Sequence, residues 1–338
     1  MAKISVLGSG GWGTAIAVML AKNGHSVKLW SYLESECEDL KNCRENKPYL
    51  PGIIIPESIE FTCDMAKCAN ADITVMATPS HGVRATAKRF AEFAQKNSII
   101  LNISKGIEEE TYETLSEVLK DELPMCQIAV MSGPSHAEEV SRGIPTTNVV
   151  ASEHQEVAEY IQDVFMNPNF RVYTNSDILG VELGGSLKNV YALCCGIIEG
   201  MGLGDNTKAA LMTRGLVEMK RLGVKLGAKE ETFSGLSGMG DLIVTCTSIH
   251  SRNKRAGVLI GKGATAEEAQ KEVKMVVEGI RTCRAAKELS DRVEVEMPIV
   301  NEAYDVLFRG GKLSEVIPKL MGRMKKNESE FDFLGKRA

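Results

Sequence analysis

Two lysines lie where an ammonium group could act on a bound ligand. Lys188 stands near the start of a strongly apolar helical pattern, and Lys105 follows the apolar run 99–102. Burial disfavours the charged form of a lysine, so such a residue must reach a cleft or an anion, and its pKa falls toward the range useful for acid–base catalysis. The alternative for Lys188 is that its side chain extends past the apolar surface to solvent, beside Asn189. The alternative for Lys105 is a solvated position on the rim of a loop.

A second set of polar residues suits a phosphate ester. Ser251, Arg252 and Asn253 offer in sequence a hydroxyl, a guanidinium fork and an amide, which together can bind a phosphate monoester. The alternative is an ordinary basic start of a helix. Upstream, Asp241 is a carboxylate within the glycine-dense segment 235–242, and it could orient an ammonium group.

A glycine pattern near the N-terminus is typical of a dinucleotide-binding loop. Gly8, Gly10 and Gly13 follow an apolar run and open an amphipathic segment. In this context Gly8 permits a tight turn, Gly10 lets the backbone approach a pyrophosphate, and Gly13 lets the helix pack on the strand. A glycine-rich turn that binds nothing is the alternative.

The pattern does not decide between NAD and NADP. An acidic residue at the end of the second strand would favour NAD. The chain has Trp30-Ser31-Tyr32 there, with no carboxylate before Glu34 and no arginine before Arg44. Both cofactors remain open.

The elements that must position these residues change character along the chain. Short apolar runs alternate with helical patterns over the first 176 residues, which predicts a doubly wound parallel sheet with helices on both faces, an α/β fold of the Rossmann type. After that, long helical patterns dominate. We therefore expect a dinucleotide-binding domain over 1–176 and an all-helical substrate domain over 177–338, with a mobile polar tail from Lys326. The expected strands are 4–7, 27–30, 59–62, 73–77, 99–102, 128–131, 148–151 and 171–174, and the expected helices include 14–23, 83–95, 153–166, 187–198, 208–226, 266–277 and 280–289.

Three polar loops follow strands of the predicted sheet, at 78–81, 104–106 and 132–136. Ligands bind beyond the carboxyl ends of strands in such sheets, so these loops should face the ligand. Gly-Pro pairs also mark ordinary turns, and no chemistry is assigned to His81 or His136.

Composition excludes several classes of function. The net charge is −5 without a basic stripe, which argues against a nucleic-acid or membrane surface. The nine cysteines are odd in number and form no Cys-x-x-Cys pair, so we expect neither a disulfide framework nor a metal site, and free thiols suit a reducing cytoplasm. No signal peptide and no apolar run of membrane-spanning length is expected.

Seven motifs occur in an order that resembles a known family. They are Gly8-Ser-Gly-Gly-Trp-Gly-Thr-Ala, Ser104-Lys-Gly, Ser132-Gly-Pro-Ser, Gly184-Gly-Ser-Leu-Lys-Asn, Gly238-Met-Gly-Asp-Leu, Ser251-Arg-Asn and Val277-Glu-Gly. Together they resemble the bacterial-type NAD(P)-dependent glycerol-3-phosphate dehydrogenases over residues 3 to 325. The resemblance implies a Rossmann domain followed by an all-α domain of the 6-phosphogluconate dehydrogenase-like type, with the active site between them.

The resemblance also implies roles for individual residues. Lys188 matches the catalytic lysine, and Lys105 matches a lysine that serves both substrate and cofactor. Further substrate contacts are implied at Gly133, Ser135, Asn189, Asp241, Ser251, Arg252 and Asn253, and cofactor contacts at Gly8, Gly10, Gly11, Trp12, Gly13, Tyr32, Ala137, Arg252, Val276 and Glu278. Tyr32 stands where some relatives carry histidine or arginine, which again leaves NAD and NADP open.

The implied reaction interconverts glycerol 3-phosphate and dihydroxyacetone phosphate by hydride transfer, in a cytoplasmic homodimer that supplies glycerol 3-phosphate for phospholipid synthesis. Two alternatives share the architecture: a hydroxyacid or 6-phosphogluconate-type dehydrogenase, and a nonenzymatic dinucleotide sensor.

Overall fold

Eight strands of the N-terminal half form one sheet. The computed structural model describes residues 1–325, 327 and 328, so the tail expected from Lys326 lies almost wholly outside the described residues. The sheet order is β10-β9-β8-β7-β6-β1-β2-β5, which contains the Rossmann strand order from β5 to β8. The strands are β1 (Lys3–Leu7), β2 (Ser26–Trp30), β5 (Ile59–Thr62), β6 (Ile73–Met76), β7 (Ile99–Asn102), β8 (Gln127–Ser132), β9 (Thr146–Ser152) and β10 (Phe170–Asn175).

The expectation of an all-parallel sheet is wrong at one edge. β9 pairs with β8 antiparallel, and β10 pairs with β9 parallel. The connection from β8 to β9 contains only the five-residue helix α5 (Ala137–Ser141). A parallel return usually runs through a helix that packs along the sheet for the roughly 20 Å of a six-residue strand, and a helix of about 7.5 Å is too short for this. A two-stranded hairpin, β3 (Glu45–Asn46) with β4 (Leu50–Ile54), lies outside the sheet and was not expected.

Helices cover both faces of the sheet, as the pattern predicts. Neighbouring strand residues such as Val6 and Leu7, or Val75 and Met76, belong to two different core clusters, because successive side chains of a strand point to opposite faces. One cluster contains α1 (Gly11–Lys22) and α6 (Gln155–Phe165), and the other contains α3 (Val83–Phe90) and α4 (Leu115–Glu122).

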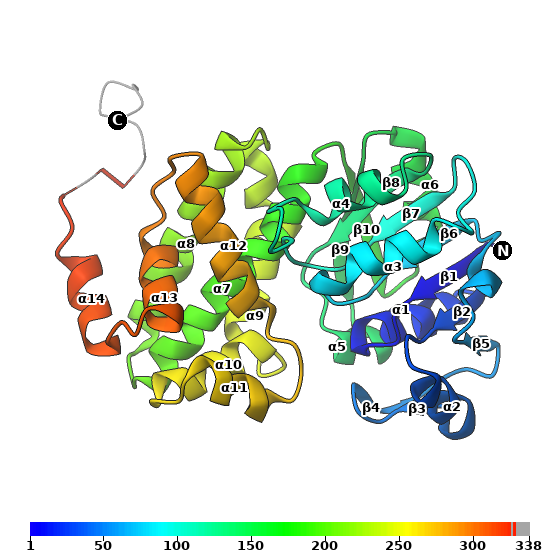
Figure 1. Cartoon of the computed structure of the whole chain (residues 1–338), viewed down its shortest axis with the longest axis horizontal. Helices are drawn as coiled ribbons and strands as arrows, with labels where there is room; N and C mark the ends of the chain where they lie inside the picture. The colour runs from blue at the N-terminus through cyan, green and yellow to red at the C-terminus, as the bar shows by residue number, and fades with distance from the viewer. Residues whose placement is uncertain (326, 329–338) are drawn as a thin grey trace.

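The rest of the described chain is helical and lies beside the sheet (Figure 1). Its centre is α7 (Ile178–Gly200), which is buried on all sides and much longer than the segment expected at 187–198. A helix without a polar face shows no amphipathic period, so its first turns escaped detection. Around it lie α8 (Asp205–Lys225), α9 (Asp241–Thr247), α10 (Arg252–Gly261), α11 (Ala266–Val273), α12 (Glu278–Arg292), α13 (Pro298–Phe308) and α14 (Leu313–Met321), while α2 (Glu34–Cys43) follows β2 in the first half.

Glycines let α10 approach α7 at backbone distance. A Cβ added at Gly196 would lie 2.1 Å from the Lys254 carbonyl oxygen, and one added at Gly257 would lie 2.0 Å from the Leu193 carbonyl oxygen. Any larger residue at these positions would push the helices apart. The close contact places the N-terminus of α10, which carries the expected phosphate-binding segment, against the middle of α7.

Helix α11 ends earlier than expected. The segment expected at 266–277 stops at Val273, because Lys274 adopts a left-handed conformation with φ of 57°. The chain then runs as a loop to α12, so that Val276 lies on the loop and Glu278 begins the next helix. Among the described residues, no helix is both long and apolar enough to cross a membrane.

Candidate active site

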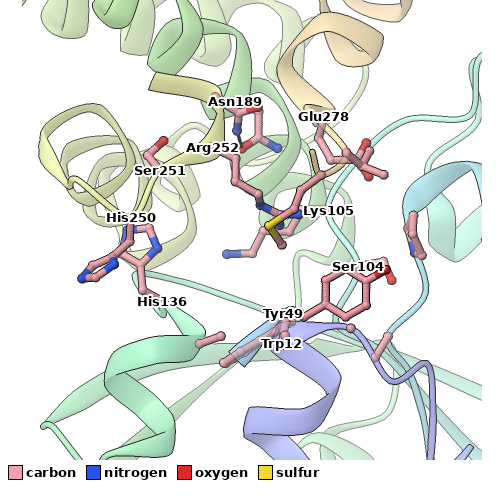
Figure 2. Close-up of a pocket in the computed structure, with 18 of the residues that line it drawn as sticks. Trp12, Tyr49, Ser104, Lys105, His136, Asn189, His250, Ser251, Arg252 and Glu278 are labelled. Carbon is pink, nitrogen blue, oxygen red and sulfur yellow. Dashed lines mark hydrogen bonds between the residues drawn. The ribbon is translucent and has the colours of Figure 1, made fainter. Parts of the chain in front are cut away.

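A cavity of about 1010 Å³ lies between the sheet and the helices, lined by residues from both halves of the chain. Figure 2 shows Trp12 and Tyr49 on one side of it and Asn189, Ser251 and Arg252 on the other. The sheet side is formed by the glycine loop and by the loops after β6 and β7. The cavity therefore opens at the carboxyl ends of the parallel strands, where this fold binds ligands.

The glycine loop has the shape that a dinucleotide needs. Gly8 has φ of +125°, and a Cβ on Gly13 would lie 2.0 Å from the Gly8 carbonyl oxygen, so both glycines are required by the turn. A Cβ at Gly10 would meet nothing within 4 Å, which leaves room for a ligand beside the backbone. No side chain caps the N-terminus of α1, so its amide groups are free to bind a phosphate.

The two lysines share one carboxylate. Lys188 Nζ donates to Asp241 Oδ1 at 2.8 Å, and Lys105 Nζ donates to Asp241 Oδ2 at 2.5 Å. The Asp241 side chain is 2% exposed, that of Lys188 7% and that of Lys105 18%. Lys188 and Lys105 line the cavity, whereas Asp241 lies behind them. The carboxylate therefore holds two ammonium groups at the cavity wall.

Burial lowers the pKa of Lys188 to about 8. Asp241 opposes this shift and Lys105 adds to it. Burial alone would raise the pKa of Asp241, but Lys105 and Lys188 together keep it below its usual value. The carboxylate is thus charged near neutrality, and Lys188 is mostly protonated at pH 7 but reaches half protonation at about pH 8, much closer to neutrality than an ordinary lysine and therefore useful in acid–base catalysis.

Thr245 completes this cluster and was missed in the sequence. Lys188 Nζ donates to Thr245 Oγ1 at 2.7 Å, and the hydroxyl donates in turn to Asp241 Oδ1 at 3.2 Å. Thr245 lies four residues after Asp241 on α9, and residues four apart share one helix face. This spacing could have identified Thr245 as a neighbour of Asp241 if the helix α9 had been predicted.

The segment at the start of α10 is fixed by its neighbours. Asn253 Nδ2 donates to Asn189 Oδ1 at 2.9 Å, and the Gly279 amide donates to Asn253 Oδ1 at 2.8 Å. Ser251 caps the helix by accepting from the Lys254 amide at 3.2 Å. By contrast, the exposed Arg252 guanidinium lines the cavity and makes no hydrogen bond or salt bridge within the described residues. A cation in this position is available to an anionic ligand.

Comparisons with known proteins indicate the same family for both halves of the chain. Residues 3–158 match the family model of the NAD-dependent glycerol-3-phosphate dehydrogenase N-terminus, and residues 177–318 match that of its C-terminus. The chain is 52% identical to glycerol-3-phosphate dehydrogenase [NAD(P)+] of Desulfitobacterium hafniense, over 98% of this chain and 94% of that protein. It is 53% identical to the protein of the same description from Moorella thermoacetica, over 97% and 98%.

The chain belongs to the NAD-dependent glycerol-3-phosphate dehydrogenase family. It is therefore an NAD(P)-dependent oxidoreductase.

Solved structures agree with this family and with the expected fold class. The crystal structure of glycerol-3-phosphate dehydrogenase from Coxiella burnetii superposes with a TM-score of 0.92 at 35% identity, covering 95% of this chain and 99% of that one. A likeness in fold alone extends to D-mandelate dehydrogenase, with a TM-score of 0.63 at 12% identity over 90% and 96% of the two chains. The prediction of a Rossmann domain followed by a helical domain is thereby confirmed.

Most residues implied by the glycerol-3-phosphate dehydrogenase resemblance line the cavity. Those are Gly8, Gly10, Gly11, Trp12, Tyr32, Lys105, Ser135, Ala137, Lys188, Asn189, Ser251, Arg252, Asn253, Val276 and Glu278. Three do not. Gly13 packs against Gly8, the Gly133 carbonyl accepts from Lys105 Nζ at 3.0 Å, and Asp241 reaches the cavity only through its two lysines.

Glu278 crosses from α12 to the sheet side. Its carboxylate accepts from the Ser80 amide at 3.1 Å and from the Ser80 hydroxyl at 2.6 Å, and Ser80 belongs to the loop after β6. The residue expected to contact cofactor therefore also joins the two halves of the cavity. Among the described residues, no group of three or more metal-ligating side chains is arranged to hold an ion.

Proposed function

We propose that this chain catalyses reversible hydride transfer between NAD(P)H and C2 of dihydroxyacetone phosphate, giving sn-glycerol 3-phosphate. The observation that carries the proposal is the Lys105–Asp241–Lys188 cluster, which faces the cavity that the glycine loop also lines. Lys188 lies on α7 in the second half of the chain, and the glycine loop lies in the first half. The proposed proton donor and the proposed cofactor site therefore face each other across the cavity.

The cofactor would be held by backbone amides of the glycine loop and of the N-terminus of α1, with further contacts from Trp12, Tyr32, Ala137 and Val276. These residues line one continuous cavity, and the open space beside Gly10 fits a pyrophosphate. Bound reduced nicotinamide would supply the hydride to C2. The family membership supports dependence on NAD or NADP.

Lys188 would supply the proton. As C2 gains hydride, its oxygen becomes an alkoxide and needs a proton, which the Lys188 ammonium can donate; in the reverse direction the neutral amine accepts it. Reduction therefore needs protonated Lys188 and slows as the pH rises through about 8, while oxidation quickens over the same range. Asp241 and Thr245 hold the amine in place through hydrogen bonds of 2.8 and 2.7 Å, and Lys105 adds positive charge near the developing alkoxide.

The phosphate group of the substrate would bind at the start of α10. Arg252 has a free guanidinium at the cavity, and Asn253 and Asn189 are fixed beside it. The binding energy gained at the phosphate, away from the reacting atoms, can then hold C2 in line with the nicotinamide. Ser135, whose hydroxyl donates to the Gly133 carbonyl at 2.9 Å, lines the opposite side.

The test is a substrate panel with purified protein. We expect oxidation of NADH or NADPH with dihydroxyacetone phosphate and little turnover with 6-phosphogluconate or short hydroxyacids. Turnover with a hydroxyacid instead would assign the chain to the related dehydrogenases. Tight dinucleotide binding without turnover of any substrate would favour a sensor.

The setting of the enzyme is part of the proposal. All nine cysteines are free thiols, which supports a reducing cytoplasm, and the resemblance to the family supports a homodimer that needs no metal and provides glycerol 3-phosphate for phospholipid synthesis. We further propose that residues 1–176 and 177–338 act as cofactor and substrate domains.

A further inference from the structure

A carboxylate lies on the cavity wall beside the glycine loop. Glu36 belongs to the first turn of α2, and the Ser9 hydroxyl donates to its Oε2 at 3.4 Å. Glu36 lines the cavity together with Trp30 and Tyr32, the residues around the end of β2. Within the described residues it makes no salt bridge. It is therefore an acceptor that is free toward the cavity.

This is the part of a Rossmann fold where the adenosine ribose binds. In NAD-binding members an acidic residue at the end of the second strand accepts hydrogen bonds from the ribose hydroxyls. Here the end of that strand carries no carboxylate, since Trp30 is followed by Ser31 and Tyr32. Instead, the helix that follows, α2, places the Glu36 carboxylate beside the glycine loop.

The cations on the same side of the cavity are otherwise engaged. Among the described residues of the first half, Lys105 is the one lysine or arginine that lines the cavity, and it pairs with Asp241. Arg44 donates to the carbonyls of Pro56 and Ile59. Arg89 lies over the Tyr32 ring, with its guanidinium carbon 5.5 Å from the ring centroid, and does not line the cavity.

Besides Lys188 and Arg252, three further cations line the cavity from the helical half, namely Arg255, Lys271 and Lys274. They belong to α10 and to the end of α11, on the side opposite the Rossmann wall. None of these three residues makes a salt bridge to Glu36 within the described residues. The Glu36 carboxylate therefore has no paired cation among the described residues that line the cavity.

We propose that Glu36 makes this enzyme selective for NAD(H) over NADP(H) by accepting hydrogen bonds from the adenosine ribose and repelling a 2′-phosphate. The inference rests on the proposed placement of the dinucleotide. A 2′-phosphate carries between one and two negative charges near neutrality. Next to an unpaired carboxylate, its repulsion corresponds to a preference on the order of tenfold to a hundredfold.

The test is direct binding, without substrate. Both tryptophans of the chain, Trp12 and Trp30, line the cavity, so quenching of tryptophan fluorescence reports on the site itself. We expect the Kd for NADH to be at least about tenfold lower than that for NADPH. In Glu36→Gln the two values should approach each other to within about threefold, mainly because NADPH binds more tightly.

Glu34→Gln is the matched control. Glu34 lies in the same first turn of α2, is exposed and does not line the cavity, so both variants lose one acid at the helix N-terminus but only Glu36→Gln changes the cavity. An unchanged ratio of the two Kd values in Glu36→Gln, or NADPH binding as tight as NADH in the unaltered protein, overturns the selectivity while leaving the proposed function intact. Binding of neither dinucleotide overturns both.

Discussion

Replacing Asp241 with asparagine removes the charge that pairs with both lysines while keeping the shape of the side chain. In the unaltered protein the carboxylate lies 2.8 Å from Lys188 Nζ and 2.5 Å from Lys105 Nζ. A paired carboxylate typically holds the pKa of its partner up by about 1–3 units. The pKa of Lys188, about 8 with the carboxylate present, should therefore fall well below that value.

The two directions of the reaction should respond with opposite signs. In reduction Lys188 must be protonated, so a pKa well below 7 leaves on the order of a tenth of the enzyme or less active at pH 7. In oxidation Lys188 must be neutral, so the rising limb of the pH profile should move to lower pH. Poorer orientation of the Lys188 amine will lower kcat in both directions, but only the change in the pKa of Lys188 moves the limb of the pH profile.

Stability should fall as well. Removing one partner of a buried ion pair costs about 3–5 kcal/mol, because it leaves an uncompensated charge. The loss should be smaller at pH 9, where Lys188 can be neutral, than at pH 6. Urea unfolding at the two pH values measures the difference.

The assay is the pH dependence of kcat for glycerol 3-phosphate oxidation, with Asp205→Asn as control. Asp205 pairs with Lys208 at 2.8 Å on the surface, with its side chain 96% exposed, so its loss should leave the profile unchanged. If the limb of Asp241→Asn stays in place, or moves to higher pH, the reasoning about the shared carboxylate is refuted.

Three further substitutions test other parts of the site. Arg252→Ala should raise the KM for dihydroxyacetone phosphate by about tenfold to a hundredfold, as expected for loss of charged hydrogen bonds, and an unchanged KM and kcat/KM would remove its role. Thr245→Val should lower kcat about fivefold to tenfold with little change in KM, through loss of one hydrogen bond to the amine; a change in KM alone would contradict this. Gly257→Ala should destabilise the fold by about 1–3 kcal/mol in urea unfolding, because its Cβ would lie 2.0 Å from the Leu193 carbonyl oxygen. Gly204→Ala, whose Cβ meets nothing within 4 Å, is the control, and equal stability of the two variants would contradict the packing argument.

Local patterns in the sequence were enough to predict the sheet and the cofactor loop. The apolar runs predicted all eight strands of the sheet, and the spacing of Gly8, Gly10 and Gly13 predicted a turn that the structure contains. These features depend on residues close together in the chain. The direction of β9 was predicted wrongly, because it depends on the length of α5, which only the folded connection reveals.

The chemistry of the site depends on contacts between distant residues. Lys105 and Asp241 are 136 positions apart, and Lys188 and Asp241 are 53 apart, so no local pattern could show that both lysines share one carboxylate. Lys188 was expected near the start of a helix but lies in the middle of α7, because the uniformly apolar first turns gave no period. The sequence left open which groups could stabilise a lysine at this buried position. In the structure, Asp241 and Thr245 accept hydrogen bonds from Lys188 Nζ.

The central claim is that the Lys188 ammonium donates the proton to dihydroxyacetone phosphate as this substrate is reduced. The most direct test is Lys188→Met, which keeps the volume of the buried side chain and leaves Asp241 paired with Lys105. Stopped-flow oxidation of NADH by dihydroxyacetone phosphate should slow by on the order of 10²–10⁴, while the Kd for NADH, read from tryptophan fluorescence, stays within about twofold. Near-normal turnover in this variant would contradict the account.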